Sequence, residues 1–293
     1  MSGTQIQQTV PYPVVHRNRR RRILSGIAEH SVAIVLSIAF LAPFAIIFLT
    51  AFMTQVQAGT GSLWPRPWVW TNFGDVLQVM PFWRNFANTV LYAVCACVGV
   101  VLSSTPVAYA LSRIKWRARE WVFIVVLATM MIPVQVTSLP LYVMYAKFGW
   151  LGTLAPLLVP CFFGDAYSIF LLRQFFLTIP QELTEAARID GANEFQIMMR
   201  VIVPIGKPGI AAIGLFSFLW AWNDFYNPLL YTGNSNKIQT LAVALSQLAK
   251  SSHEQAAQMQ MAAALMFAIP VIIIFFFAQR AFVEGISITG VKG

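Results

Sequence analysis

The sequence predicts an all-α, polytopic membrane protein with six transmembrane helices, and its composition supplies three reasons. Of its 293 residues, 58% are hydrophobic and only 11% are charged, well below the roughly 25% charged residues of soluble domains. The mean hydropathy of +0.66 excludes a disordered chain, because disorder requires low hydrophobicity. Three cysteines are too few for a disulfide scaffold, and the length accommodates six spans of about 20 residues with their connections.

Six apolar runs are each long enough to cross about 30 Å of hydrocarbon, at a rise of about 1.5 Å per residue. We expect spans at residues 30–53, 87–111, 121–145, 151–172, 209–230 and 261–283. The first run is longer than the apolar core of a signal peptide, which has about 7–15 residues, and no small-residue cleavage site follows it. It is therefore interpreted as a retained helix. Pro133 and Pro140 lie inside the third run, where they predict a kink or tight packing.

Basic residues set the expected orientation, because short loops rich in Lys and Arg stay on the cytoplasmic side. With the N-terminus inside, fifteen of the twenty Lys and Arg residues fall in inside segments. Both termini are therefore expected to be cytoplasmic. The net charge of +9 then reflects this topology and an attraction to anionic lipid, and no nucleic-acid partner is expected.

The spans divide the chain into five segments. They are a basic cytoplasmic tail at 1–29, the first transmembrane helix at 30–53, an external loop at 54–86, a five-helix core at 87–283 and a cytoplasmic C-terminal tail at 284–293. The external loop is rich in Gly, Pro and Trp, which favours an irregular loop with aromatic side chains near the membrane interface. The core includes a cytoplasmic loop at 177–205 that is long for a connection between spans.

The loop at 177–205 carries well-defined helix signals. Thr178 followed by Gln181 is typical of a capped helix start, with Thr178 as the N-cap and Gln181 at N3. The residues that then recur at helical spacing on one face are Leu183, Ala186, Ala187 and Asp190. Two adjacent alanines leave that face flat, so another protein surface can approach it closely.

A bend and a second helix are expected to follow. Gly191 can adopt the left-handed conformation that ends a helix. Asn193 and Gln196 can cap a second helix that runs to Pro204. The loop is therefore predicted to hold two short helices at an angle to each other on the cytoplasmic side.

In this chain Glu185-Ala186-Ala187 is followed by Gly191 and, after a hydrophobic position, by Pro204. This spacing resembles the EAA loop of ABC importer permeases. The family pattern usually has Ile and Leu where this chain has Val201 and Val203, which are conservative changes.

The resemblance extends from about residue 87 to the end of the chain. The segments 170–176, 189–192 and 222–225, together with the ending 290–293, are similar to the carbohydrate-uptake branch of these permeases, and specifically to the maltose-system MalG type.

The resemblance implies a type I ABC importer permease fold in a bacterial plasma membrane. In such importers the EAA loop forms a coupling helix that docks into a cleft on a cytoplasmic ATPase subunit. Glu185 would then meet a basic or polar group of the ATPase, while Ala186, Ala187 and Gly191 permit close packing and Pro204 completes the motif. The implied partners are a homologous second permease subunit, two copies of the ATPase, and an extracytoplasmic solute-binding protein that delivers a sugar or polyol.

The chain is not expected to bind a cofactor or to catalyse a reaction. Its only Gly-Lys pair, Gly206-Lys207, precedes Pro208 and follows no glycine loop, so it cannot form a P-loop. ATP and Mg²⁺ are therefore expected on the partner ATPase. Cys95 and Cys97 point to different helix faces, and no clustered His accompanies Cys161, so no metal site is expected.

Two acidic residues lie inside spans, where a charge costs about 2.5–3.5 kcal/mol at the bilayer centre and usually faces a cavity or a partner. Asp224 follows Trp222 and Asn223, a combination of rings and hydrogen-bonding groups that suits a sugar. It can equally cap a helix break before Pro228 or pair with the neighbouring permease. Asp165 is expected to line the substrate pathway or to serve packing.

A different class of protein would explain the same two carboxylates. A secondary carrier that works without an ATPase could couple transport to protons through Asp165 and Asp224. Such carriers are commonly built from inverted repeats, and this sequence has no such repeat.

Overall fold

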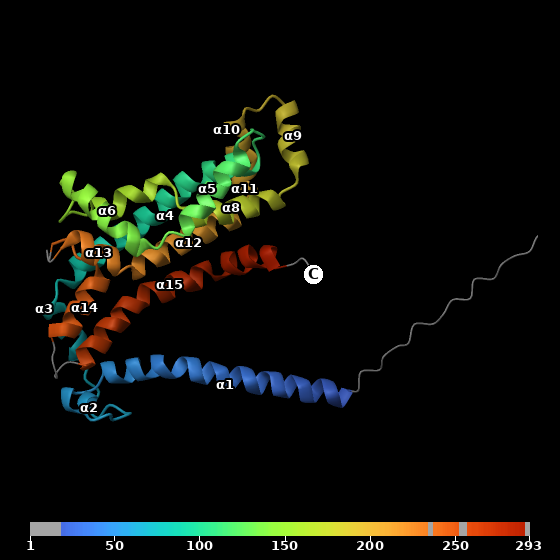
Figure 1. The fold of residues 1–293 in the computed structure, drawn as a ribbon. Coiled ribbons are helices and arrows are strands. Elements are labelled where there is room, and N and C mark those ends of the chain that lie inside the picture. The colour runs from blue at the N-terminus through green and yellow to red at the C-terminus, as the bar shows by residue number, and fades with distance from the viewer. Residues whose placement is uncertain (1–18, 234–236, 252–256, 291–293) are drawn as a thin grey trace, which may run out of the picture. The chain divides into compact units, whose positions relative to one another are not determined.

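The computed structural model describes residues 19–233, 237–251 and 257–290, with side chains for 27–233, 237–250 and 257–277. Every regular element in these ranges is a helix, which confirms the all-α prediction (Figure 1). The chain separates into two units, Met1–Phe48 and Leu49–Gly293.

The first unit consists, in its described part, of most of helix α1 (Arg19–Ala51). The helix begins inside the predicted tail at 1–29, before the expected start of the span at residue 30. Every described side chain from 27 to 46 is exposed, and most of them are apolar. A helix that is apolar around its whole circumference is suited to contact lipid. The stretch Ile27–Ala51 is also long and apolar enough to cross a membrane.

The second unit contains three more apolar stretches without a sharp bend and two sharply bent ones. The first is Phe82–Arg113, which is formed by α4 (Phe82–Ser112). The second is Ala155–Thr178, which contains α7 (Ala155–Leu158), the 3₁₀ helix η1 (Val159–Phe163) and α8 (Ala166–Thr178). The third is Ala257–Phe277, which lies in α15 (Ala257–Gly290). In the bent stretches, α5 (Arg119–Met130) meets α6 (Val134–Lys147) at 93°, and Glu194–Ile205 meets α12 (Lys207–Asn223) at 80°. With each bent pair counted as one span, the described residues hold six, the predicted number.

The third span differs from the single helix expected at 121–145. The chain leaves the helix at Met131, and Pro133 has an extended conformation, with φ −61° and ψ 135°. Proline has no N–H to donate, and its ring disfavours a helical conformation at the preceding residue, Ile132. The sequence signal for the kink was therefore present, but the result is a sharp break.

The fourth and fifth spans are also interrupted. The fourth begins at Ala155 and runs past its expected end at residue 172, and it breaks at Gly164, whose φ is +90°. In the fifth, α12 ends at Asn223, and α13 (Tyr226–Thr232) follows after a break at Asp224 and Phe225. Each break frees backbone groups that other protein groups must satisfy inside a membrane.

The segment at 54–86 differs from the irregular loop expected there. It contains α2 (Gln55–Gly59) and α3 (Thr71–Val79), and α4 already begins at Phe82. Asn72 on α3 donates to the backbone carbonyls of Ala51 and Met53 at 2.8 and 2.9 Å, which ties α3 to the backbone at the start of the second unit. The segment between α13 and α15 holds α14 (Leu241–Ser251), which packs on α4 and α15.

Helix α4 is the central element of this unit, because it packs against α8, α12, α14 and the 3₁₀ helix η1. One buried apolar cluster surrounds Tyr92, Ala93 and Trp222, and a second surrounds Tyr109 and Phe176. Tyr92 and Tyr109 lie on the same helix, so α4 joins the two clusters.

Glycines let these helices approach closely. A Cβ atom on Gly99 of α4 would lie 2.9 Å from the backbone oxygen of Cys161 in η1, closer than real side chains approach. A Cβ atom on Gly209 of α12 would lie 2.8 Å from the Phe175 ring of α8. The backbone at Cys161 cannot swing aside as a flexible side chain can, so the Gly99 contact fixes the spacing of α4 and η1.

The substitution Gly99→Ala is expected to destabilise the protein by about 1–3 kcal/mol, because α4 and η1 must separate to admit the methyl group. The measurement is the midpoint of thermal unfolding in detergent. Gly74→Ala is the matched control, since Gly74 also lies in a helix but has nothing within 4 Å of the added methyl group. The control is expected to be neutral or stabilising by up to about 1 kcal/mol. Equal midpoints for the two variants would contradict the close contact.

Candidate functional site

The first helix of the predicted loop at 177–205 begins two residues later than its sequence signal indicated. Thr178 is not the N-cap of the loop helix but the last residue of α8, and its hydroxyl donates to the Phe175 carbonyl at 2.7 Å. The loop helix α9 (Gln181–Ile189) has Pro180 as its N-cap. The apolar sequence after residue 172 prolongs α8, and the chain turns only where the proline forces Ile179 into an extended conformation.

The bend and the second helix follow as predicted. Gly191 has φ +83°, the left-handed conformation that ends a helix, and the N–H of Ala192 donates to the Ala187 carbonyl at 3.0 Å. Asn193 and Gln196 form a reciprocal capping box with bonds of 3.0 and 2.9 Å.

The second helix changes its winding before it reaches the membrane span. It runs through α10 (Glu194–Ile197), the π-helix η2 (Met198–Ile202) and α11 (Val203–Ile205), and Gly206 separates it from α12. Pro204 has no N–H to give the Arg200 carbonyl four residues earlier, which accounts for the wider winding just before it.

The face of α9 that the sequence predicted is split in the structure. Thr184 is buried and Ala187 packs against the apolar cluster around Tyr109, so both point inward. Leu183, Ala186 and Ile189 point outward, and Ile189 is 86% exposed. The outer face therefore includes Ala186 but not Ala187. The prediction grouped the two neighbouring alanines on one face, although successive residues of an α-helix point about 100° apart.

Polar side chains tie the two loop helices to each other and to α4. The Arg188 Nε donates to Glu194 Oε1 at 2.8 Å, and the Tyr109 hydroxyl donates to Glu194 Oε2 at 2.6 Å. The hydrogen bond from Arg188 holds the pKa of the Glu194 carboxyl below its ordinary value, and the bond from Tyr109 adds to that effect. The ionised Glu194 carboxylate therefore stabilises the loop at pH values above the ordinary glutamate pKa. This stabilisation is lost as the pH falls through the lowered pKa of Glu194.

Two buried arginines join the ends of α4 and α8 in a reciprocal arrangement. Arg113, at the end of α4, donates to the backbone carbonyls of Phe176 and Ile179 at the end of α8. Arg173 of α8 donates in return to the Leu111 carbonyl of α4 at 3.0 Å. Positive side chains suit the carbonyl ends of helices, which carry partial negative charge.

Arg173 also reaches the start of α5. Its guanidinium donates to both carboxylate oxygens of Glu120 at 3.0 and 3.1 Å and lies 3.9 Å from the centre of the Phe123 ring. The sequence placed Arg113 and Arg173 among the basic residues that set orientation, and it gave no sign that they are buried. In the structure they are 3% and 7% exposed.

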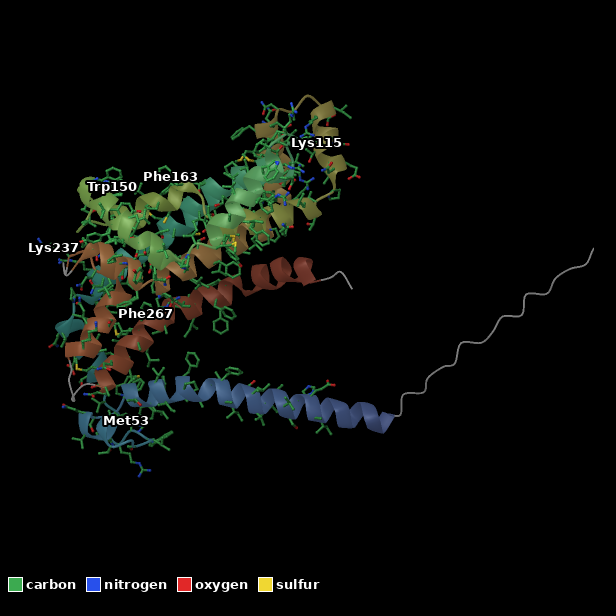
Figure 2. All side chains as sticks on the ribbon, viewed as in Figure 1. Met53, Lys115, Trp150, Phe163, Lys237 and Phe267 are labelled. Atoms are coloured by element: carbon green, nitrogen blue, oxygen red, sulfur yellow. The ribbon has the colours of Figure 1, made fainter. Side chains whose placement is uncertain are left out.

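A cavity of about 610 Å³ lies between α4, α6, α7, η1, α8, α12 and α13. Its polar lining comes from Asp165, Ser168, Ser217 and Asn227, and its aromatic lining comes from Tyr92, Tyr145, Tyr167, Phe216, Trp220 and Tyr231. Figure 2 shows that Lys115 lies at the end of the bundle that carries α9 and α10, whereas Trp150 and Lys237 lie at the opposite end.

The four residues that the sequence assigned to a substrate pathway have different positions. Asp165 lines the cavity, and its Oδ2 accepts the Ser168 N–H at 2.8 Å as the N-cap of α8. Asp224 lies behind the wall, where it accepts bonds from Tyr92 and Asn227. This is the capping role that stood as the alternative for Asp224.

Trp222 and Asn223 do not line the cavity. Trp222 is 1% exposed, and its indole N–H donates to the Phe267 carbonyl at 3.3 Å. The Asn223 amide donates to the Leu219 carbonyl at 2.8 Å on its own helix. Trp220, which lies two positions before Trp222, lines the cavity instead. Because α12 is apolar on every side, its sequence pattern does not distinguish the face that carries Trp220 from the one that carries Trp222.

Comparisons with known proteins agree with this architecture. Residues 104–288 match the family described as "Binding-protein-dependent transport system inner membrane component". The chain is 34% identical over 222 residues to the osmoprotective compounds uptake permease protein GgtD of Synechocystis. The aligned region covers 75% of this chain and 74% of the relative. It is 32% identical over 212 residues to the arabinooligosaccharides transport system permease protein AraQ of Halalkalibacterium halodurans, covering 72% and 75%.

A solved structure shares the fold. It is the crystal structure of a bacterial ABC transporter involved in the import of the acidic polysaccharide alginate, and one of its chains superimposes with a TM-score of 0.75 at 26% identity. The match covers 92% of this chain and 99% of that one. The family match spans well over half of the sequence and includes both the loop and most of the cavity. The chain therefore belongs to the family of inner membrane components of binding-protein-dependent transport systems.

Proposed function

We propose that this chain is the membrane-spanning permease subunit of an ATP-driven ABC importer that moves a sugar or related carbohydrate. Membership of the family supports the transport role, and the substrates named for AraQ and for the alginate transporter support the substrate class. The observation that supports an ATP-driven mechanism is the exposed outer face of α9, because a protein that only provides a path for substrate does not need such a face.

The outer face of the loop is an apolar surface suited to a protein partner. Ile189 is 86% exposed, Phe195 is 68% exposed and Leu183 is 42% exposed, all within one short loop. Glu182 and Glu185 lie among them and are also exposed. An apolar centre with charged residues at its edge is typical of a binding surface. In the proposal this face docks on the ATPase, with Glu185 meeting a basic or polar group, Ala186 allowing close approach, Gly191 setting the angle of α9 and Pro204 ending the loop.

Ala187 has a different role in this proposal from the one its motif implies. It packs inward against the cluster around Tyr109, and it therefore holds α9 on the bundle while Ala186 meets the partner.

The proposed partner sets the orientation of the chain. ATP and its Mg²⁺ are in the cytoplasm, so the face of α9 must be cytoplasmic, and both termini then lie on the same side. The distribution of basic residues supports this orientation in a bacterial plasma membrane. A second homologous permease, two ATPase copies and an extracytoplasmic solute-binding protein complete the proposed assembly, and this chain binds neither nucleotide nor metal.

The substitution Gly191→Val is expected to reduce ATP-driven uptake at least tenfold while the chain still inserts into the membrane. A β-branched residue disfavours φ +83°, so α9 would leave the angle at which it docks. The measurements are uptake in vesicles and the amount of ATPase that co-purifies with the chain.

Gly149→Val is the matched control for Gly191→Val. Gly149 has φ +69° and nothing within 4 Å of an added Cβ, as Gly191 has, but it follows α6, outside the loop. Uptake and ATPase co-purification are expected to remain near the parent level in the control. Equal losses of uptake and of ATPase co-purification in both variants would contradict a coupling role for Gly191.

The substitution Arg113→Ala is expected to lower the number of substrate molecules imported per ATP hydrolysed, by about tenfold. It removes the Arg113 bonds to the Phe176 and Ile179 carbonyls at the end of α8, so movement of α9 is no longer transmitted to α4 through this contact. Arg113→Lys should recover part of the ratio, because it restores a cationic donor. Arg117→Ala is the control, since Arg117 is exposed in the same connection. A proportional fall of uptake and hydrolysis, with the ratio unchanged, would indicate a purely structural role.

A further inference from the structure

The described lining of the cavity carries a single charged residue, and its charge is negative. Among the described lining residues, Asp165 carries a carboxylate, and no Lys, Arg or His is present. A solute that enters this space therefore meets a fixed negative group without any cation to pair with. Repulsion between like charges is stronger here than in water, because the surrounding side chains and lipid screen it less.

The natural binding position for an anion is already occupied. A helix N-terminus attracts negative groups through its free N–H groups and its dipole. At the start of α8 the Asp165 carboxylate itself accepts the Ser168 N–H at 2.8 Å. The carboxylate therefore takes the donor that a phosphate or a sugar acid would otherwise use.

A second carboxylate lies directly behind the cavity wall. Asp224 Oδ2 accepts the Tyr92 hydroxyl at 2.8 Å and the Asn227 side-chain amide at 2.9 Å, and both of these residues line the cavity. These bonds hold the Tyr92 ring and the Asn227 amide in place. They also use the Tyr92 hydroxyl hydrogen and one of the two amide hydrogens of Asn227, so the Asn227 side chain keeps one donor and its oxygen acceptor for a solute.

The cavity also offers tyrosine hydroxyls to a solute. Tyr145 and Tyr231 are each 4% exposed, and their rings meet edge to face with centres 5.1 Å apart. Within the described part of the chain neither hydroxyl forms a hydrogen bond, and neither is sealed from solvent. An uncharged hydroxyl donor and a carboxylate acceptor together match the hydroxyl groups of a sugar.

Aromatic faces complete the lining. Trp220 and Tyr167 are 57% and 46% exposed, and Tyr167 meets Phe216 edge to face at 6.4 Å. Such rings pack well against the flat C–H faces of sugar rings. Neither ring attracts an anion, since the face of an aromatic ring carries partial negative charge.

We propose that this cavity is a binding site for an uncharged sugar or polyol and that Asp165 makes it reject anionic solutes such as uronic acids and sugar phosphates. The proposal rests on the carbohydrate import proposed above and narrows its substrate class. It separates this chain from the transporter of the acidic polysaccharide alginate, despite the shared fold.

The chain contains a built-in probe of the cavity charge. Cys161 lines the cavity, and Cys95→Ala with Cys97→Ala leaves it as the only cysteine. In membrane vesicles that carry the assembled transporter, Cys161 is modified with two methanethiosulfonates of similar size, one cationic and one anionic. After correction for their reactivity toward a free thiol, the cationic reagent is expected to react about tenfold faster.

The substitution Asp165→Asn in this background is expected to reduce that ratio at least threefold. Asparagine caps a helix as well as aspartate does, so the start of α8 is retained while its charge is lost. Asp190→Asn is the control, because it removes an equal charge from the exposed loop after α9 and should leave the ratio unchanged. A ratio near one in the parent, or no change in Asp165→Asn, would overturn the proposal.

Protection by solutes gives the second readout. Maltotriose or arabinotriose is expected to slow the modification of Cys161, whereas trimannuronate at the same concentration is not. Protection by trimannuronate alone, or by none of the three, refutes the assigned selectivity. ATP-driven uptake in the same vesicles is scored separately, so that failure of the import function is distinguishable from failure of the charge selection.

Discussion

Within a bilayer, every break in a helix leaves backbone N–H and C=O groups that only other protein groups can satisfy. This chain breaks its spans at several points, and polar side chains close three of its helix ends. Asp165 caps the start of α8, Asp224 caps the start of α13, and Arg113 takes the carbonyls at the end of α8. The residues that make the breaks possible are thus the same residues that define the cavity and the loop.

The long helix α4 connects these polar contacts. Tyr92 holds Asp224 at the cavity wall, and Tyr109 holds Glu194 in the loop, 17 positions further along an uninterrupted helix. At about 1.5 Å per residue, the two contacts lie about 25 Å apart along the axis. Arg113 adds the end of α8, so both flanks of α9 are attached to the last turns of α4. A displacement of α9 therefore has a rigid element on which to act.

Local sequence signals predicted the features that local physics controls. Gly191 and the Asn193–Gln196 capping box lie where their spacing placed them, because a turn or a cap depends on its immediate neighbours. The choice between Trp220 and Trp222 could not be made from the sequence, since a helix that is apolar on all sides has no periodicity to read. The burial of Arg113 was also inaccessible, because its partners are backbone carbonyls 63 and 66 residues away.

The charge of Asp165 is a feature that the fold itself does not need. An asparagine at this position would satisfy the same backbone N–H, and it would avoid the expense of a carboxylate in a membrane. Helix capping therefore explains the hydrogen bonding of the side chain but not why the residue is an acid rather than an amide. The remaining neighbours of the carboxylate are the cavity and its aromatic lining, so the interaction that compensates for the charge has to come from what the cavity holds, water or a solute rich in hydroxyl groups.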